Sequence, residues 1–285
     1  MLVDRVTVLG AGRMGQGMAL ALRRSGLPAL LWGRRAKVVH RELQLQTGEL
    51  AKAVGEDGVL LLAVPDDAIA GLARELAETG AVRRGHVVLH LSGLQDREVL
   101  APLAAVAGGL GSFHPLQTIA DPADAAERWR GAYAAIEGDA IAREAGRVLA
   151  ERLGLTPVEV PASAKPAYHI AAVFCANYVV TLAAVAEEIA TGAGIEPRLA
   201  ANMYLPLLAG AVGNLAGRSP AEALTGPIVR GDVATVQRHL EVLEGARRRL
   251  YAELGLATLA LARSAGLSAE RAEPLERLLR AATAR

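Results

Sequence analysis

The chain of 285 residues is long enough for two domains of moderate size, and its 52% hydrophobic content excludes wholesale disorder. Its 31 basic and 30 acidic residues leave a formal net charge of +1, which argues against a bulk nucleic-acid binder because such proteins usually carry a basic excess. The single cysteine, Cys175, excludes an intramolecular disulfide and a cysteine-based zinc cluster, and no metal site is expected.

The first half of the chain alternates strand and helix signals. A short apolar run over 6–9 ends at a glycine cluster, and apolar residues then recur at helical spacing over 13–24 until Ser25-Gly26. Further strands are expected over 29–32, 59–64, 86–91, 110–113, 132–136 and 157–160, with helices over about 68–78, 96–106 and 139–153. This alternation predicts an α/β fold with a doubly wound, mostly parallel Rossmann sheet.

After Pro161 the strand signals stop and the rest of the chain is expected to be helical. Helices fit about 166–191, 196–216, 219–224, 232–264 and 268–283, and the fourth of these can break at Gly245 or Gly255. The run Ser219-Pro220-Ala221-Glu222 predicts a capping box with proline at the first helical position. The predicted organisation is an NADP-binding Rossmann domain over 1–160 and an all-helical C-terminal domain over 161–285.

The glycine cluster after the first strand fits the pattern GxGxxG between a predicted strand and a predicted helix. Glycines allow a tight turn and close backbone approach, and the start of the helix offers unpaired N–H groups to a pyrophosphate. The alternative is a glycine-rich turn without a ligand. The cofactor-binding candidates in this loop are Gly10, Gly12, Arg13, Met14 and Gly15.

The end of the second predicted strand indicates which dinucleotide binds. An NAD enzyme usually places Asp or Glu there, whereas this chain has Trp32-Gly33-Arg34-Arg35 and no acid until Glu42. A guanidinium group can bind a 2′-phosphate that a carboxylate would repel. The sequence therefore favours NADP(H) over NAD(H), with Arg34 and Arg35 as phosphate ligands; two solvated surface arginines are the alternative.

Other candidates lie where strands of the predicted sheet end, which is where ligands bind in open α/β sheets. Val64, Pro65 and Ser92 are expected to contact the nicotinamide riboside. His114 is a candidate general acid, because histidine titrates near neutral pH; an inert loop histidine is the alternative.

The first predicted helix of the second domain carries polar groups on an otherwise apolar surface. Lys165, His169 and Asn177 follow one another at spacings of four and eight residues, so they share one face. We expect them to contribute to catalysis; pairing of His169 and Asn177 with protein groups is the alternative. The segment from Leu224 to Asp232 adds Thr225 and Arg230 as substrate-binding candidates, or is a structured turn between helices.

The apolar stretch over 170–186 is the most membrane-like part of the chain. It is marginal in length and contains Asn177 and Thr181, so we expect a buried helix and no membrane association. Asp4 and Arg5 interrupt the apolar start of the chain, which argues against a signal peptide and favours a cytoplasmic protein. A helix that is apolar nearly all round must be covered on every side, which predicts a homodimer formed through the C-terminal helices.

The N-terminal half resembles the dinucleotide-binding domain shared by pyrroline-5-carboxylate reductases, 6-phosphogluconate and 3-hydroxyisobutyrate dehydrogenases and deazaflavin-dependent NADP reductases. The stretches HLSG, SFHPLQTI, KPAYHIAAVFCANY and ALTGPIVRGD are similar, in that order, to a narrower group. These are Rossmann-like proteins labelled as NADP oxidoreductases, whose C-terminal domain has no assigned function. The resemblance covers essentially the whole chain. It implies a dimerising helical C-terminal domain and NADP binding at Gly10, Gly12, Gly15 and Arg34, and it implies no substrate.

Two neighbouring families share part of their catalytic residue patterns with this chain. Hydroxyacid dehydrogenases carry a Lys and an Asn one turn apart on a corresponding helix, whereas Lys165 and Asn177 are twelve residues apart. The His114-Pro115 pair is similar to a His-Pro in prephenate dehydrogenases, and the rest of their pattern is not evident.

The leading hypothesis is an NADP(H)-dependent oxidoreductase that transfers hydride to or from a small polar carbonyl, imine or alcohol between the two domains. His114 or Lys165 would handle the proton, and Asn177, His169 and Arg230 would orient the substrate. Two alternatives stay open: a non-catalytic NADP(H)-binding sensor or assembly protein, and a prephenate-type dehydrogenase.

Overall fold

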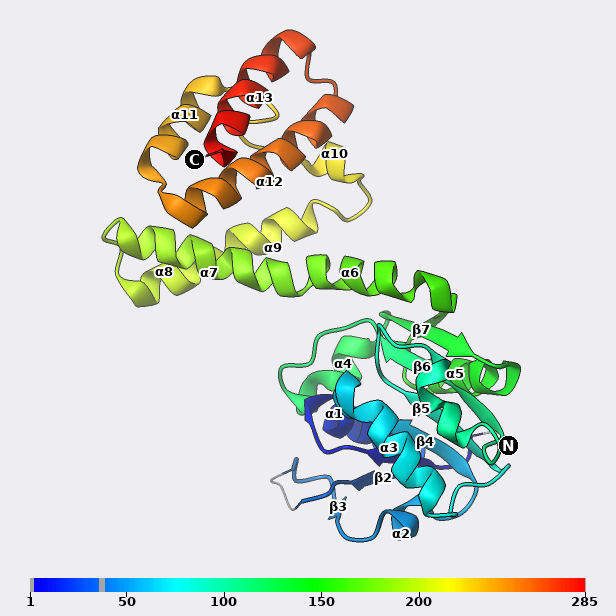
Figure 1. Ribbon diagram of the computed structural model, residues 1–285. Helices are drawn as coiled ribbons and strands as arrows, with labels where there is room; N and C mark the ends of the chain where they lie inside the picture. The colour runs from blue at the N-terminus through cyan, green and yellow to red at the C-terminus, as the bar shows by residue number, and fades with distance from the viewer. Residues whose placement is uncertain (1–2, 36–38, 285) are drawn as a thin grey trace. The chain divides into compact units, whose positions relative to one another are not determined.

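The computed structural model describes residues 3–35 and 39–284 and divides into two compact units, one ending at Asn177 and the other beginning at Tyr178 (Figure 1). The division lies inside the long helical stretch that the sequence places at the start of the C-terminal domain. The first turns of this stretch therefore group with the sheet. The domain ranges 1–160 and 161–285 stay predictions.

Among the described residues, eight strands form one sheet in the order β3-β2-β1-β4-β5-β6-β7-β8. They are β1 (Val6–Leu9), β2 (Ala29–Trp32), β3 (Leu45–Gln46), β4 (Gly58–Leu62), β5 (His86–His90), β6 (Gly109–Pro115), β7 (Tyr133–Gly138) and β8 (Thr156–Glu159). Strands β1 to β6 pair in parallel, whereas β7 runs antiparallel to β6 and parallel to β8. The predicted mostly parallel Rossmann sheet is confirmed, and its strand order reverses between β1 and β4, where such folds bind ligands.

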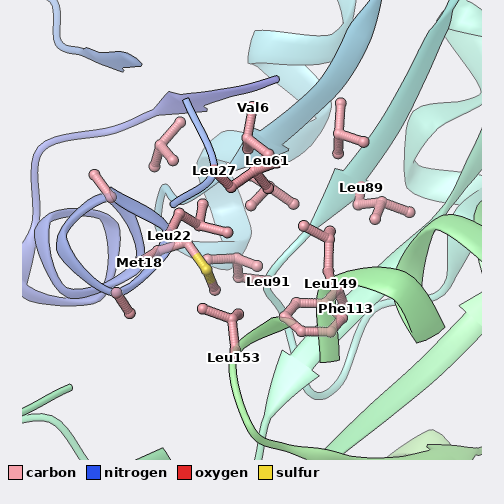
Figure 2. Close-up of a cluster of buried hydrophobic side chains, with 14 of the residues drawn as sticks. Val6, Met18, Leu22, Leu27, Leu61, Leu89, Leu91, Phe113, Leu149 and Leu153 are labelled. Atoms are coloured by element: carbon pink, nitrogen blue, oxygen red, sulfur yellow. The ribbon is translucent and has the colours of Figure 1, made fainter. Parts of the chain in front are cut away.

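Helices cover both faces of the sheet. They are α1 (Arg13–Arg24), α2 (Leu50–Val54), α3 (Asp66–Glu78), α4 (Ala125–Trp129) and α5 (Ala140–Arg152), with 3₁₀ helices η1 (Arg97–Leu103), η2 (Pro122–Asp124) and η3 (Ala162–Ala164). Alternate residues of each strand face opposite layers: Val59 and Leu61 pack with α1, α4 and α5, whereas Leu60 and Leu62 pack with α2, α3 and η1. Figure 2 shows the first of these cores, in which Met18 and Leu22 of α1 lie near Leu61 and Phe113.

The second unit is helical, as predicted, and α6 (Lys165–Cys175) belongs to the first unit. The remaining helices are α7 (Asn177–Gly192), α8 (Pro197–Met203), α9 (Leu205–Gly213), α10 (Pro220–Ala223), α11 (Val233–Val242), α12 (Gly245–Ser264) and α13 (Ala269–Thr283). Three expected long helices are divided: at Ala176, at Tyr204 and just before Gly245. The predicted capping box at Ser219 and Glu222 is present. Apolar residues of α11, α12 and α13 form this unit's core.

The apolar stretch is not buried within the single chain. The helical segment Ala162–Gly192 is long and apolar enough to cross a membrane by length and composition, with a window hydropathy of 1.8, and none of that window is buried. Within this segment Val180 is 70% exposed and Phe174 is 61% exposed. The prediction of a buried helix over 170–186 is therefore not met in the structure.

Candidate functional site

The glycine loop lies at the carboxyl ends of β1 and β4, and its three fingerprint glycines have different surroundings. Gly10 has a φ of +128°, and a Cβ there would lie 2.3 Å from the carbonyl oxygen of Ala63. A Cβ at Gly15 would lie 1.8 Å from the carbonyl oxygen of Gly10. These two glycines permit close packing of loop, strand and helix. A Cβ at Gly12 would meet nothing within 4 Å, so Gly12 borders open space that a ligand can fill.

The start of α1 faces the same space. The first hydrogen bond within the helix is donated by the Gln16 backbone to the Gly12 carbonyl, at 2.9 Å. The backbone N–H groups of the three residues before Gln16, which include the predicted Arg13 and Met14, precede this ladder and remain able to bind an anion. The first turn of α1 contains no acidic residue that would repel a pyrophosphate. The loop and helix therefore fit a dinucleotide phosphate group.

A cavity of about 440 Å³ extends from this loop along the end of β2. Its lining includes predicted cofactor ligands and parts of α3: Gly10, Ala11, Gly12, Trp32, Gly33, Arg34, Arg35, Val64, Pro65, Ala68 and Leu72. The structure thus brings the glycine loop, both arginines and the end of β4 around one space. Arg34 donates to Glu75 of α3, with an Nη2–Oε2 distance of 2.7 Å.

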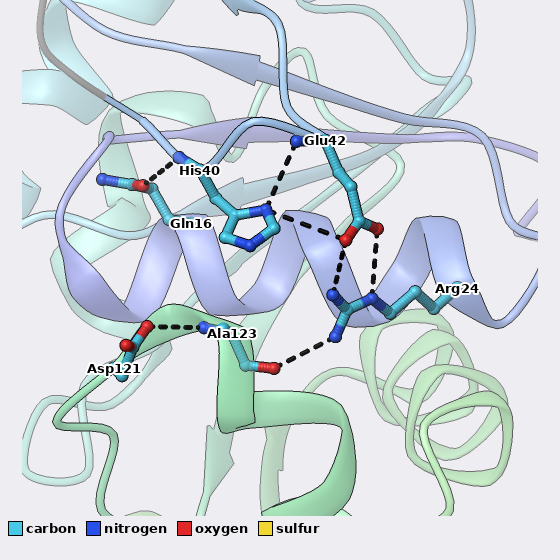
Figure 3. Close-up of polar contacts among 6 residues, drawn as sticks. All are labelled: Gln16, Arg24, His40, Glu42, Asp121 and Ala123. Atoms are coloured by element: carbon cyan, nitrogen blue, oxygen red, sulfur yellow. Dashed lines mark hydrogen bonds and ion pairs between the residues drawn. The ribbon is translucent and has the colours of Figure 1, made fainter.

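Glu42, the first acid after β2, is held away from the glycine loop. Its carboxylate forms two hydrogen bonds with Arg24, Nη2–Oε1 at 2.7 Å and Nε–Oε2 at 3.2 Å (Figure 3). Arg24 ends α1, whose length of 12 residues places it about 18 Å from the loop. The Gln16 side chain accepts from the backbone of His40 at 3.1 Å and fixes the same segment. Glu42 therefore does not replace the missing acid of β2.

A second group of side chains gathers where β5 and β6 end. The His114 Nδ1 lies 2.8 Å from the Tyr168 hydroxyl, and the rings of His114 and His169 are 6.3 Å apart. A Cβ at Gly93 would lie 2.9 Å from both histidine rings, so this glycine allows the rings to approach the backbone. Burial lowers the pKa of His114 to about 4, with the charges of Lys165 and His169 acting in the same direction. Burial raises the pKa of Tyr168 to about 12.

Lys165 lies beneath this group, with only 1% of its surface exposed. Its Nζ donates to the Ser112 hydroxyl at 2.7 Å and to the Ser92 carbonyl at 3.3 Å. The Ser112 hydroxyl in turn lies 3.4 Å from the carboxylate of Glu137, its register partner on β7. Burial lowers the pKa of Lys165, and the carboxylate of Glu137 opposes this shift. The ammonium is thus part of a buried network that fixes the start of α6 on the sheet.

Comparisons with known proteins agree with this geometry. Residues 3–115 match a Rossmann-like domain, and residues 132–258 match a domain of unknown function, DUF2520. The two matches follow one another along the chain in the order that the resemblance implies, a Rossmann-like domain and then a DUF2520 domain. They confirm the resemblance and the fold class drawn from the sequence.

Individual relatives of the chain are distant. A glycerol-3-phosphate dehydrogenase [NAD(P)+] from Halorhodospira halophila is 32% identical over 47% of this chain, and the chain spans only 45% of that enzyme. A solved candidate NADP oxidoreductase from Bacteroides fragilis has a TM-score of 0.72 at 21% identity, covering 91% of this chain and 99% of that one. An imine reductase from Myxococcus stipitatus in complex with NADP+ has a TM-score of 0.58 at 21% identity, covering 92% and 93%.

Of the other predicted site residues, three are exposed and one, Ser92, is buried. Asn177 begins α7 and is exposed, as are Thr225 and Arg230 in the second unit. The segment around Arg230 is a structured turn, in which the Asp232 backbone donates to the Pro227 carbonyl at 2.9 Å. Ser92 has 5% of its surface exposed; its hydroxyl donates to Asp66 at 2.7 Å and accepts from the Leu94 backbone at 3.1 Å.

Four residues of the site were not singled out from the sequence. Tyr168 precedes His169 and lies three residues after Lys165. This spacing places Tyr168 on the same side of a helix as Lys165 and could have identified it as a site residue. Glu75, Ser112 and Glu137 carry no such local signal. Their roles depend on the packing of α3 beside β2 and on the antiparallel register of β6 and β7.

Proposed function

We propose that the protein is an NADP(H)-dependent oxidoreductase that transfers hydride to or from a small polar carbonyl, imine or alcohol. The observation that carries the proposal is the cavity that joins the open cradle at Gly12 to two arginines at a strand end without an acid. The Bacteroides protein is described as an NADP oxidoreductase, the Myxococcus protein as a complex with NADP+ and the Halorhodospira enzyme as NAD(P)+-dependent, which supports the same cofactor class.

The nicotinamide supplies the hydride when the cofactor is bound. The chain's own residues hold and orient the dinucleotide: the first turn of α1 binds the pyrophosphate, Arg34 and Arg35 bind the 2′-phosphate, and Val64 and Pro65 flank the riboside. Ser92 acts indirectly: its hydroxyl accepts hydrogen bonds from the backbone N–H groups of Leu94 and Gln95 and so fixes the turn after β5.

His114 and Tyr168 handle the proton in this proposal. Tyr168 stays protonated at neutral pH and donates its hydroxyl proton to Nδ1 of His114, which leaves the ring hydrogen on Nε2. As hydride reaches a carbonyl carbon, the C–O π bond breaks and the oxygen becomes negative. The Nε2–H is donated to that oxygen while Nδ1 takes the Tyr168 hydroxyl proton, so His114 stays neutral, and the Tyr168 oxygen then takes a proton from water. His169, beside the same glycine, orients the substrate.

Lys165 acts as a positioning residue rather than as the proton donor. Its ammonium is already committed to Ser112 and Ser92 and has almost no exposed surface. By fixing the first turn of α6, it places Tyr168 and His169 against β6. Asn177, Thr225 and Arg230 remain proposed substrate contacts, and all three are exposed.

Fluorescence titration with NADPH and NADH, followed by turnover with a panel of small carbonyls and imines, tests the proposal. Trp32 lines the cavity, so its emission should be quenched when either nucleotide binds. We expect tighter binding of NADPH and turnover of at least one panel member. Binding without any turnover across a broad panel would favour the non-catalytic sensor, and absence of binding would refute the proposal.

We also propose that a second copy of the chain covers α6 and α7. Both sides of these helices carry exposed apolar residues, among them Ile170 at 58% and Val180 at 70%, which a soluble protein normally covers. Light scattering at micromolar concentration should give a dimer, and the protein should not sediment with lipid vesicles. A monomer, or vesicle binding, would contradict this assembly and the expected cytoplasmic location.

A further inference from the structure

An exposed ion pair lies at the edge of the proposed cofactor cavity. Nη2 of Arg34 is 2.7 Å from Oε2 of Glu75, and the two side chains are 63% and 44% exposed. Glu75 follows Leu72 by one turn of α3, and Leu72 lines the same cavity as Arg34. Its carboxylate is therefore held beside the residue proposed to bind the 2′-phosphate.

Glu75 supplies a carboxylate near the end of β2, where the sequence of β2 itself has no acidic residue. NAD-binding proteins use a carboxylate at the end of the second strand to accept hydrogen bonds from the ribose hydroxyls. Here β2 ends at Trp32 and is followed by Gly33, Arg34 and Arg35, and the carboxylate comes from the neighbouring helix. Glu75 and the arginine thus favour different nucleotides at one position.

We propose that Glu75 is a specificity-determining residue that limits discrimination between NADPH and NADH by competing with the 2′-phosphate for Arg34. The inference rests on the proposed cofactor site. When a 2′-phosphate binds, Arg34 must share or leave its carboxylate partner, and two anionic groups face one guanidinium. With NADH, which lacks the phosphate, the ion pair stays intact and Glu75 can accept from a ribose hydroxyl.

The size of the effect follows from the exposure of the pair. Exposed ion pairs contribute little, so releasing Arg34 from Glu75 should tighten phosphate binding by about two- to fivefold. The Glu75 carboxylate also repels the phosphate, so at low salt we expect a gain in affinity near the upper value of this range. The difference should shrink as salt rises, because the charges are in solvent.

Glu75→Gln tests the inference, with Glu78→Gln as the matched control. Glu78 is an exposed carboxylate one turn farther along α3, so both changes remove one negative charge from the same helix. Titration calorimetry with the full chain should show that E75Q binds NADPH about two- to fivefold more tightly, whereas E78Q changes NADPH affinity much less. E75Q should leave NADH affinity unchanged or weaken it.

A double-mutant cycle with Arg34→Gln identifies the partner. In the R34Q background, E75Q should no longer tighten NADPH, because the competed-for guanidinium is gone. Equal effects of E75Q and E78Q, weaker NADPH binding by E75Q, or an unchanged effect in the R34Q background would overturn the inference while leaving the cofactor assignment intact. Absence of binding of either dinucleotide to the native chain would overturn the proposed function and this inference together.

Discussion

Replacement of Lys165 by methionine removes the buried ammonium and keeps most of the side-chain volume. Two hydrogen bonds are lost, the short one to Ser112 and the longer one to the Ser92 carbonyl. A hydrogen bond to a charged group is worth about 1.5–3 kcal/mol, and removing one member of a buried charged set leaves the other uncompensated at a further cost. We expect K165M to lower the free energy of unfolding by about 2–4 kcal/mol near neutral pH.

The loss should depend on pH through Glu137. Burial raises the pKa of Glu137, and Lys165 opposes that rise, so the pKa of Glu137 should be higher still in K165M. A carboxyl whose pKa is raised in the folded state is stabilising when protonated, and this contribution is lost as pH rises through the folded pKa. The loss of unfolding free energy in K165M should therefore be larger at about pH 7.5 than at about pH 5.

Urea unfolding followed by tryptophan emission reads this domain directly, because Trp32 and Trp129 are both buried in the sheet unit and are the chain's two tryptophans. Lys52→Met is the matched control: Lys52 pairs with Glu49 at 3.1 Å but is 79% exposed, so its loss should cost under about 1 kcal/mol. Glu137→Gln added to K165M should restore part of the stability. A K165M defect equal to that of K52M, or one independent of pH, would refute the assignment of a buried, charge-compensated lysine.

Three further results are expected. His114→Gln should lower kcat by about 10²–10⁴-fold with NADPH affinity unchanged in fluorescence titration; an equal loss of NADPH affinity would speak against a role in proton transfer. Because the pKa of His114 is lowered to about 4, its imidazole should be neutral throughout the neutral range, and no His114 titration should appear in the pH–rate profile at about pH 6.5; a step there that is lost in His114→Gln would contradict the buried neutral imidazole. Gly12→Ala should weaken NADPH binding at least about tenfold and leave the melting temperature nearly unchanged, because the added methyl group meets no protein atom. Gly15→Ala should lower the melting temperature, because its methyl group would overlap the Gly10 carbonyl.

The secondary structure of the sheet unit was largely predictable because each buried strand is a continuous apolar run and each helix has strong end signals. Helix α1 begins at Arg13 and ends at Arg24, as the glycine fingerprint and Ser25-Gly26 predicted. The sequence reading missed β3 and α2, which are two and five residues long and too short for periodicity to identify.

The helical unit was less predictable where helices follow one another directly. The expected helix over 196–216 is divided at Tyr204, and Pro206, which has no backbone N–H, lies in the first turn of the helix after the break. Pro206 was therefore a sequence signal that could have indicated this break. The break at Ala176 has no proline or glycine beside it, and nothing in the sequence explains it.

The candidate site was predictable where strand ends and the glycine pattern define it, and less so where partners come from distant elements. Arg34 was identified from its place after β2, but its partner Glu75 is 41 residues away in sequence. Lys165 was identified as a polar group on an otherwise apolar helix, but its burial depends on Ser112 and on the register that sets Ser112 beside Glu137.

The grouping of α6 with the sheet has a consequence for recombination between related proteins. The His114–Tyr168 pair joins β6 to a helix that lies beyond the last strand, so residues 1–160 contain the glycine loop and His114 but not the partner of His114. A chimera that exchanges the helical half at residue 160 would replace Tyr168, His169 and the anchoring lysine. A chimera joined after Asn177 would keep the proposed proton-transfer pair native and exchange only the remaining helices. Crossover position, rather than choice of donor domain, should then decide whether such hybrids retain their chemistry.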